Sequence, residues 1–423
     1  MQALHPRPEL HQFCPVCPDR PLLQPLGFQI PCLFTMIEAR CPTCHRDFLV
    51  QRSRSSAPGD WMMLEPQTGK VHSSLPGEWL ERMLDWAWRS KHDRPVSIET
   101  ITRRPVRRPL VANCIEYYYG HCLGLLYDLP NVLAANPDRD VIAIVQRPIA
   151  WMVPDGVAEL WIVDTPLSEG HAFSSALASE LKRRITAFDE CGIDGSSITG
   201  SVDISKLTRI KPFDWRAEES LGTPVVTFVI REDRCWLYRA RRTPEAEIPL
   251  RQAQIMDLLA QGLLHYIPGI DLAVVGFGSA GKFSPSVQDM RVARGQRPDE
   301  IAWTKRYARS HIVLGVHGSN MLLPAAHAAA SIEIVPLEKF VNMANAYEFI
   351  SHEPPVDAVR HHHFMPMSIT LTEVATLISA TLHFVRASAF TQQTKFADQA
   401  IRARLHAQYS DVLRFPEPII IEG

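Results

Sequence analysis

The chain has 423 residues, of which 46% are hydrophobic, and a formal net charge of −2. This length exceeds what one core usually holds and indicates a small module followed by two α/β lobes. The balanced charge gives no general attraction to nucleic acid or to membranes. The sequence contains no uninterrupted run of about 18 apolar residues, the pattern that would predict a membrane span. The first residues, MQALHPRPELHQF, lack the pattern of a secretory signal. We therefore expect a cytoplasmic protein that does not bind nucleic acid as its main partner.

Five of the nine cysteines lie in the first 44 residues. Four of them form two CxxC motifs, Cys14 with Cys17 and Cys41 with Cys44. Two such motifs at this separation place four thiolates around one Zn²⁺, which predicts a structural zinc ribbon over residues 1–55. Two disulfides or redox motifs are the alternative, and the absent secretion signal disfavours them. The ribbon can contact nucleic acid, dock a protein or staple the N-terminus, and docking or stapling is the favoured interpretation.

Residues 56–112 are expected to form a helical and linker segment. The stretch 51–61 and the basic, proline-bearing stretch 93–110 have the composition of connections, and an amphipathic helix is predicted for 79–91. Basic runs in these connections are interpreted as solvated linkers.

The α/β pattern begins at residue 113 and indicates two lobes, each with a parallel sheet. The first lobe, 113–220, is predicted to contain a helix at 115–135, strands at 141–146 and 159–163, and a helix at 174–190. The second lobe, 221–368, is predicted to contain strands at 225–231 and 272–277 and helices at 251–266 and 298–310. Two helices, 371–386 and 390–409, are expected within the C-terminal segment 369–423.

Residues 311–336 have the pattern of a strand, a turn, a helix over 321–330 and a second strand. The turn His317-Gly318-Ser319-Asn320 would lie at the carboxyl end of the first strand, where open parallel sheets bind ligands. Gly318 removes a side chain where a ligand approaches, and the other three residues can donate hydrogen bonds to phosphate oxygens. An ordinary strand-to-helix connection is the alternative.

Two further motifs are discounted. Residues 276–281 match GxGxxG, but the sequence that follows contains Pro285 and no helical periodicity, so a loop is predicted there. The histidines at 361–363 have no second ligand set in view and are predicted to form a polar strand or loop.

Three separated segments resemble one enzyme family. They are residues 113–130, NCIEYYYGHCLGLLYDLP; 228–234, FVIREDR; and 301–336, which lead into 342–347. Together they resemble the glycosyltransferases that include xylan arabinosyl- and xylosyltransferases, the EGF-domain O-GlcNAc transferase and bacterial polysaccharide enzymes. The resemblance implies a GT-B fold, a nucleotide-sugar donor, a glycan or protein acceptor and a role in polysaccharide biosynthesis. Two departures are Ser319 in place of the usual alanine and a spacing of seven, not four, between His121 and Asp128.

The predicted chemistry is consistent with this resemblance. Sugar transfer needs positive charge or N–H groups around the leaving diphosphate and a base for the acceptor hydroxyl. Arg231 and Arg234 follow a predicted strand and can grip phosphate in a bidentate manner, although surface salt bridges are the alternative. Glu333 can hold ribose hydroxyls or be an edge carboxylate.

His121 and Asp128 are the candidate bases, because a spacing of seven puts them on one helical face. Tyr117, Tyr118 and Tyr119 can stack on a sugar ring or pack beneath the helix.

The sequence therefore predicts a metal-independent, inverting glycosyltransferase with a structural Zn²⁺ and a possible protein partner at the ribbon. One alternative is a fucosyltransferase-like enzyme that uses a GDP-sugar. Another is a noncatalytic module that binds glycan or nucleotide while the ribbon recruits a protein or nucleic acid.

Overall fold

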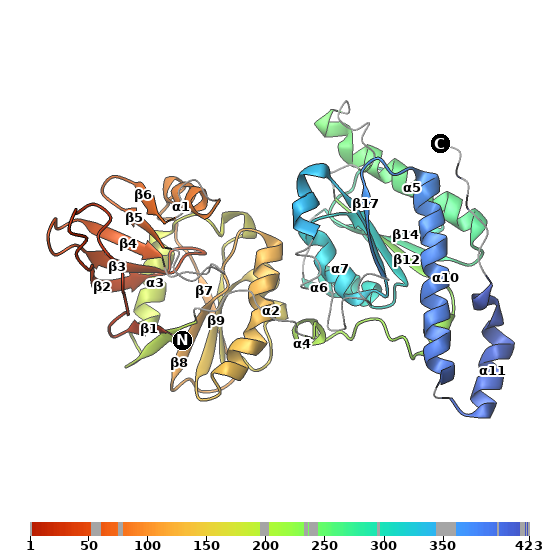
Figure 1. Cartoon of the computed structure of the whole chain (residues 1–423), viewed down its shortest axis with the longest axis horizontal. Helices are drawn as coiled ribbons and strands as arrows, with labels where there is room; N and C mark the ends of the chain where they lie inside the picture. The colour runs from red at the N-terminus through yellow and green to blue at the C-terminus, as the bar shows by residue number, and fades with distance from the viewer. Residues whose placement is uncertain are drawn as a thin grey trace. The chain divides into compact units, whose positions relative to one another are not determined.

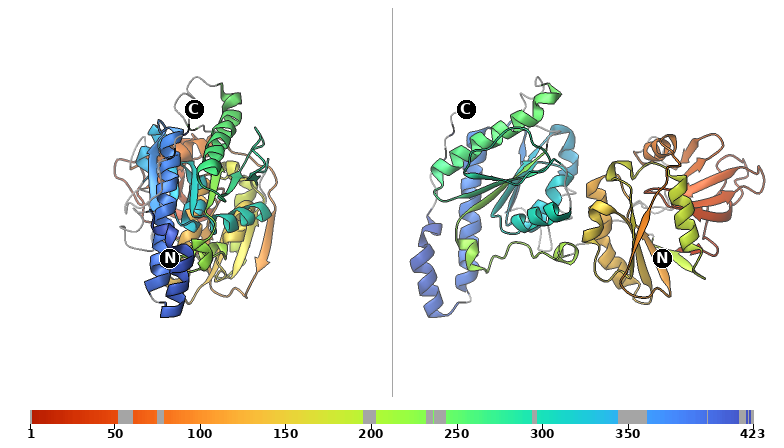
Figure 2. Two further views of the ribbon diagram at one scale, coloured as in Figure 1. Left: turned by 90° about the vertical axis from the view of Figure 1, so that its right-hand side faces the viewer. Right: turned by 180° about the vertical axis from the view of Figure 1, so that it is seen from behind.

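The computed structural model of the chain is shown in Figures 1 and 2. It describes residues 2–51, 61–74, 79–194, 203–231, 236, 244–293, 297–343, 361–395, 397–414, 419 and 421. The chain forms two compact units, Met1–Val202 and Asp203–Gly423, here called unit 1 and unit 2. Each contains parallel strands and helices, so the chain is a mixed α/β protein. The division into five segments made from the sequence stays a prediction.

Unit 1 begins with an antiparallel sheet in the order β2-β3-β4-β5-β6. Its elements and the helix that follows are β2 (Gln24–Gln29), β3 (Met36–Arg40), β4 (Asp47–Gln51), β5 (Met62–Glu65), β6 (Lys70–Ser73) and α1 (Trp79–Arg89). Successive side chains of a strand point to opposite faces. Ile37 accordingly packs in a cluster with Ile142 of the second sheet, whereas Met36 packs in another with Leu84 of α1. The two faces of this sheet therefore pack in two different hydrophobic clusters.

The second sheet of unit 1 has the order β1-β11-β8-β9-β10-β7. Its strands are β1 (Gln2–His5), β7 (Ile98–Thr102), β8 (Pro109–Asn113), β9 (Asp140–Gln146), β10 (Glu159–Val163) and β11 (Cys191–Ile193), with α2 (Tyr119–Ala135) and α3 (Ser175–Ile185) as its helices. The four central strands are parallel, and the two edge strands β1 and β7 are antiparallel to their neighbours. The chain leaves β8 for β9 on one side and returns to β11 on the other, so the carboxyl end of β8 is a switch point of this sheet.

Unit 2 has one parallel sheet in the order β14-β13-β12-β15-β16-β17. The strands are β12 (Val225–Ile230), β13 (Asp271–Gly276), β14 (Val287–Asp289), β15 (Ile312–Val316), β16 (Ser331–Val335) and β17 (His362–Pro366). The helices are α4 (Ser205–Thr208), α5 (Ile248–Tyr266), α6 (Arg297–Tyr307), α7 (Leu322–His327), α10 (Leu371–Lys395) and α11 (Gln399–Tyr409). Counted from β12, the order is 3-2-1-4-5-6, that of Rossmann folds, and its switch point lies between β12 and β15.

Helices cover both faces of the unit 2 sheet, as Figures 1 and 2 show. Phe228 of β12 packs in a cluster with Met256 of α5 and Ile378 of α10, whereas its neighbour Val229 packs with Trp303 of α6. Strands buried on both faces read as continuous apolar runs. This is why the sequence located β12, β13, β15 and β16 to within about one residue.

Other expectations were wrong or only partly right. The segment 56–112, expected to be helical and linker, also contains strands β5 and β6. The stretch 93–110, expected to be a connection, contains β7 and the start of β8. The two C-terminal helices were placed wrongly, because α10 continues to Lys395 before α11 begins. The loop predicted for 276–281 is confirmed. Gly276, with a φ of 117°, ends β13, and a Cβ there would lie 2.5 Å from the carbonyl oxygen of Ile230, so this glycine serves packing against β12.

Helix α10 is long and apolar enough, by length and composition, to cross a membrane. Half of its most apolar stretch is buried inside the chain, with Val374, Ile378 and Val385 in the main core cluster of unit 2. In this structure α10 is a core helix of unit 2 (Figure 1).

Candidate functional site

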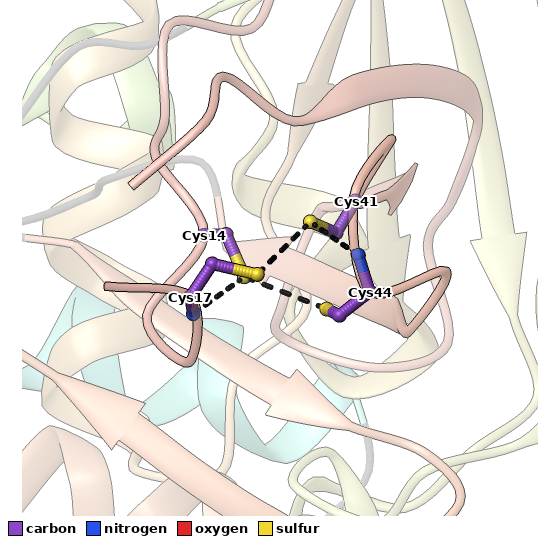
Figure 3. A group of neighbouring side chains, drawn as sticks. All are labelled: Cys14, Cys17, Cys41 and Cys44. Carbon is purple, nitrogen blue, oxygen red and sulfur yellow. Dashed lines mark hydrogen bonds between the residues drawn. The ribbon is translucent and has the colours of Figure 1, made fainter. Parts of the chain in front are cut away.

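The four cysteines predicted to bind metal come together in unit 1 (Figure 3). Their sulfur atoms all lie within 4.8 Å of one another, with 3.9 Å between Cys14 and Cys44 and 3.7 Å between Cys17 and Cys41. Four sulfurs at about 2.3 Å from a tetrahedral Zn²⁺ are about 3.8 Å apart, since the edge of a tetrahedron is about 1.6 times its centre-to-corner distance. A disulfide needs about 2.05 Å, so these thiols are unpaired. The cluster has the size of a tetrahedral metal site.

The environment of the cluster also suits thiolate ligands. The N–H of Cys17 donates to the sulfur of Cys14 and the N–H of Cys44 to the sulfur of Cys41, at 3.5 and 3.4 Å. Burial opposes ionisation of Cys41, yet the N–H groups of Cys44 and Thr43 lower the pKa of its thiol to about 7. Burial raises the pKa of Cys17 to about 12. Burial thus disfavours the charged thiolate form of these cysteines. A bound cation would favour it, because metal ligation requires the thiolate. The four cysteines can therefore hold a metal ion, and Cys32 lies buried outside the cluster.

In unit 2, several predicted residues meet at the switch point of the sheet. Arg231 directly follows β12 and His317 directly follows β15, two adjacent parallel strands. Arg231 donates through Nη1 to Oδ1 of Asn320 at 3.1 Å, which joins the two strand ends. Gly318 has a φ of 154°, a backbone conformation that other residues rarely adopt. The structure thus places a guanidinium, an imidazole and an amide at the edge where doubly wound sheets bind ligands.

The helix after this turn is shorter than predicted. A 3₁₀ turn over Ser319–Met321 precedes α7, which has only six residues. A helix this short carries little macrodipole, because the dipole grows with the number of aligned peptide units. The macrodipole of α7 therefore adds little to anion affinity at this edge.

His317 forms a buried pair with Glu333 of β16. His317 Nδ1 lies 2.6 Å from Glu333 Oε2, and both side chains are almost completely buried. The register of β15 and β16 places Glu333 opposite Gly315, two residues before the histidine. Burial raises the pKa of Glu333, and the contact with His317 opposes this shift. Glu333 lies on an interior strand, so the alternative of an edge carboxylate is wrong.

Two buried polar atoms at the switch point lack a hydrogen-bond partner among the described residues. They are Nδ2 of Asn320, a donor, and Oε1 of Glu333, an acceptor. A buried polar atom left without a partner costs about 1–3 kcal/mol. A ligand that offers one acceptor and one donor would satisfy both atoms.

In unit 1, the carboxyl end of β8 carries a second polar group. Glu116 is buried, and its N–H donates to Oε1 of Gln146 at the end of β9, at 3.1 Å. Its carboxylate accepts a hydrogen bond from the N–H of Tyr117 at 2.7 Å, and its other oxygen lies 3.6 Å from Nδ1 of His121. The His121 side chain is 42% exposed. A carboxylate beside the Nδ1 of an accessible histidine is the arrangement that orients a general base.

Asp128, the other candidate base, lies farther along the same helix. Asp128 is buried in α2, and Nδ2 of Asn131 donates to it at 3.4 Å. Seven residues of α-helix advance about 10.5 Å along the axis, so the two candidate bases are about two turns apart.

Arg234 lies outside the described residues, as do residues 344–347 of the segment that resembles the glycosyltransferase family. Glu116 was not identified as a candidate site residue from the sequence. Its position between a buried strand and a helix, where open parallel sheets bind ligands, could have indicated it.

The histidine run 361–363, predicted to form a polar strand or loop, leads into β17. His362 is buried in β17 and its Nδ1 lies 2.7 Å from the hydroxyl of Ser331 in β16. His362 and His363 lie in β17, so a strand is the one of the two predicted alternatives that the structure has there.

Comparisons with known proteins add little detail. No protein-family profile matches the sequence, and no curated protein matches it. Among solved structures, the chain is similar to the glycosyltransferase SnogD from Streptomyces nogalater, with a TM-score of 0.26 and 12% identity over 69% of this chain and 78% of that one. A likeness of this size is too weak to transfer residues or chemistry between the two chains.

Proposed function

We propose that the chain is a glycosyltransferase of GT-B type that moves a sugar from a nucleotide-sugar donor to a hydroxyl group of an acceptor. The observation that carries this proposal is the switch point of unit 2, where Arg231, His317 and Asn320 meet at the carboxyl edge of a sheet with Rossmann order. Such edges bind nucleotides in open α/β sheets. The resemblance of three sequence segments to a glycosyltransferase family points to the same ligand.

A nucleoside diphosphate matches the unsatisfied atoms at this edge. Phosphate oxygens are acceptors for the Nδ2 of Asn320, and ribose hydroxyls are donors for the Oε1 of Glu333. Arg231 supplies a fixed positive charge, and His317 supplies a second donor whose orientation the carboxylate of Glu333 sets. Ser319 and Gly318 complete the turn around the phosphates in this proposal.

For the reaction, His121 is the proposed base and Glu116 its positioning residue. His121 accepts the proton of the acceptor hydroxyl, and the resulting oxygen forms a bond to the anomeric carbon of the donor sugar. The bond from that carbon to the diphosphate breaks, and the electron pair leaves with the diphosphate, whose charge Arg231 and His317 compensate. Attack on the face opposite the leaving group inverts the anomeric configuration.

The transfer is proposed to be independent of metal. Among the residues that the structure describes, the grouping with metal-binding geometry is the cysteine cluster of unit 1. Zn²⁺ is the proposed ion there, because four thiolates in a tetrahedron suit it. Its role in this proposal is structural.

Turnover of donor tests the function. The wild-type chain, incubated with UDP-, GDP-, CDP- and dTDP-sugars, is expected to release nucleoside diphosphate from at least one, slowly by hydrolysis when no acceptor is present. His121→Ala should lower this rate by about 10²- to 10⁴-fold, the usual effect of removing a general base. The matched control is His265→Ala, which removes an exposed histidine of α5 in unit 2.

Two results would count against the proposal. If no nucleotide sugar is hydrolysed or bound by the wild-type chain, the chain is a noncatalytic module. If turnover is found but His121→Ala leaves it unchanged at matched melting temperature, the base has been assigned wrongly. A specific preference for GDP-sugars would favour the fucosyltransferase-like alternative.

A further inference from the structure

Four aromatic side chains of unit 1 pack together beside Glu116, and we call them the aromatic shelf: Trp86, Tyr117, Tyr118 and His171. Trp86 comes from α1, the two tyrosines from the connection between β8 and α2, and His171 from the loop before α3. Trp86 stacks on His171 with 3.5 Å between ring centroids and an interplanar angle of 19°. Tyr117 meets Trp86, Tyr118 and His171 edge to face, at 5.1, 4.7 and 4.8 Å.

The aromatic shelf is only partly covered by protein. Trp86 is 38% exposed and Tyr118 is 47% exposed, whereas His171, which stacks on Trp86, is buried. Partly exposed Trp and Tyr rings that pack on a common third ring, here Tyr117, offer rigid, amphipathic contact area, which is typical of binding surfaces. The exposed rings therefore indicate a ligand with a flat apolar face.

The packing of the rings excludes an aromatic cage for a cation. A cage needs rings that surround an empty space, and an organic cation sits up to about 6 Å from each ring centroid. Here the rings contact one another, with centroids 4.7–5.1 Å apart around Tyr117, so no such space lies between them. What remains is the outer faces of Trp86 and Tyr118.

Polar groups lie directly beside these faces. Tyr118 also contacts the ring of His121 at 5.2 Å, and His121 lies beside the buried carboxylate of Glu116. Burial raises the pKa of Tyr118, and Tyr117 and Glu116 raise it further. Nδ1 of His171 is buried and has no hydrogen-bond partner among the described residues. The shelf thus joins apolar ring faces to an accessible histidine, His121, with a buried carboxylate behind it.

We propose that the aromatic shelf binds a glycan, with the C–H faces of its sugar rings on Trp86 and Tyr118 and a hydroxyl beside Tyr118 donating to the partly exposed His121. Sugar C–H hydrogens carry partial positive charge and are attracted to the negative face of an aromatic ring. A pyranose with equatorial hydroxyls has such a face together with a rim of donors. This inference rests on the proposed function in one respect: it identifies the acceptor as a carbohydrate rather than a peptide.

The test is direct binding of glycans without any donor. Saturation-transfer NMR on the full chain would use cellotetraose, xylotetraose, mannotetraose and N-acetylchitotetraose as probes. At least one is expected to receive saturation most strongly at its ring C–H protons. Trp86→Ala and Tyr118→Ala should each weaken that binding by 10-fold or more, and Trp86→Phe should restore part of it because a ring remains.

The matched control is Tyr266→Ala, which removes an exposed tyrosine of α5 in unit 2 and should leave glycan binding unchanged. Because Trp86→Ala can disturb folding, Tyr118→Ala, whose side chain is the more exposed, decides the test when the tryptophan variant melts early. Binding of none of the four probes, or equal binding by wild type and Tyr118→Ala, would overturn the inference.

The two proposals fail separately. Glycan binding without any turnover of nucleotide sugars leaves the aromatic shelf assigned and removes the transferase. Turnover of donor with no glycan bound at the shelf keeps the transferase and shows that the acceptor binds elsewhere or is a peptide.

Discussion

Loss of the metal from the cysteine cluster should destabilise unit 1 and leave unit 2 unaffected. Cys14, Cys17 and Cys41 belong to the same buried cluster as Phe28 and Ile142, so the cluster is continuous with the core of unit 1. No described residue of unit 2 belongs to that cluster. The chain should therefore melt in two transitions, of which only one responds to metal.

The size of the effect follows from linkage. An ion present at 1,000 times its dissociation constant stabilises the folded state by about 4 kcal/mol. For a folding unit of about 150–250 residues, each kcal/mol shifts the melting temperature by about 2–4 °C. Unit 1, Met1–Val202, is of this size, so stripping the metal should lower its melting temperature by roughly 8–16 °C.

The assay combines metal analysis with calorimetric melting. The purified chain should contain about one zinc, and a chelator should move one transition. The double variant Cys41→Ser with Cys44→Ser should lose the metal, whereas Cys32→Ala, which removes a buried cysteine outside the cluster, should keep it. A folded chain without metal, or a unit 1 transition that a chelator does not move, would refute this reasoning.

Two further predictions concern acid stability and the second candidate base. Burial lowers the pKa of His311 and His327 to about 4 and that of His362 to about 3. The unfolded chain therefore binds protons below about pH 6.5 that the folded chain does not, and unit 2 should lose stability as the pH falls from about 6.5 towards 4, by up to roughly 3 kcal/mol for each histidine. Urea midpoints at pH 7, 5.5 and 4.5 measure this, and a midpoint that does not change would contradict it. Asp128→Asn should keep donor turnover within a few-fold of wild type while His121→Ala lowers it, and a loss of 10²-fold or more in Asp128→Asn alone would make Asp128 the base.

The sequence predicted best what depends on local pattern. Four cysteines in two CxxC motifs specify a metal-sized cluster because the short turns themselves bring each pair together. The central strands of the parallel sheets were found because burial on both faces leaves an uninterrupted apolar run. Strand β7, with the sequence IETIT and mostly exposed side chains, has no such run and lies among prolines and arginines, so it was taken for a linker.

Contacts between distant segments could not be predicted in the same way. The pair His317 and Glu333 depends on the register of β15 against β16, which is a property of the folded sheet. The stacking of Trp86 on His171 joins residues 85 positions apart and depends on how α1 packs on unit 1. The prediction of His121 and Asp128 as candidate bases considered only their shared helical face. It overlooked the carboxylate that precedes the helix.

The most direct test of the donor site is calorimetric titration of UDP, GDP, CDP and dTDP into wild type, Arg231→Ala and Arg404→Ala. Arg404 is a matched control, since it forms an exposed ion pair with Glu218 at 2.9 Å, away from the switch point, and such pairs contribute little. At least one nucleotide should bind wild type and Arg404→Ala equally. Arg231→Ala should weaken that binding by roughly 1.5–3 kcal/mol, about 10- to 150-fold, as the loss of a charge-assisted hydrogen bond to phosphate would. Equal affinity in Arg231→Ala and wild type, or no binding of any of the four nucleotides to wild type, would contradict the placement of the donor at this edge.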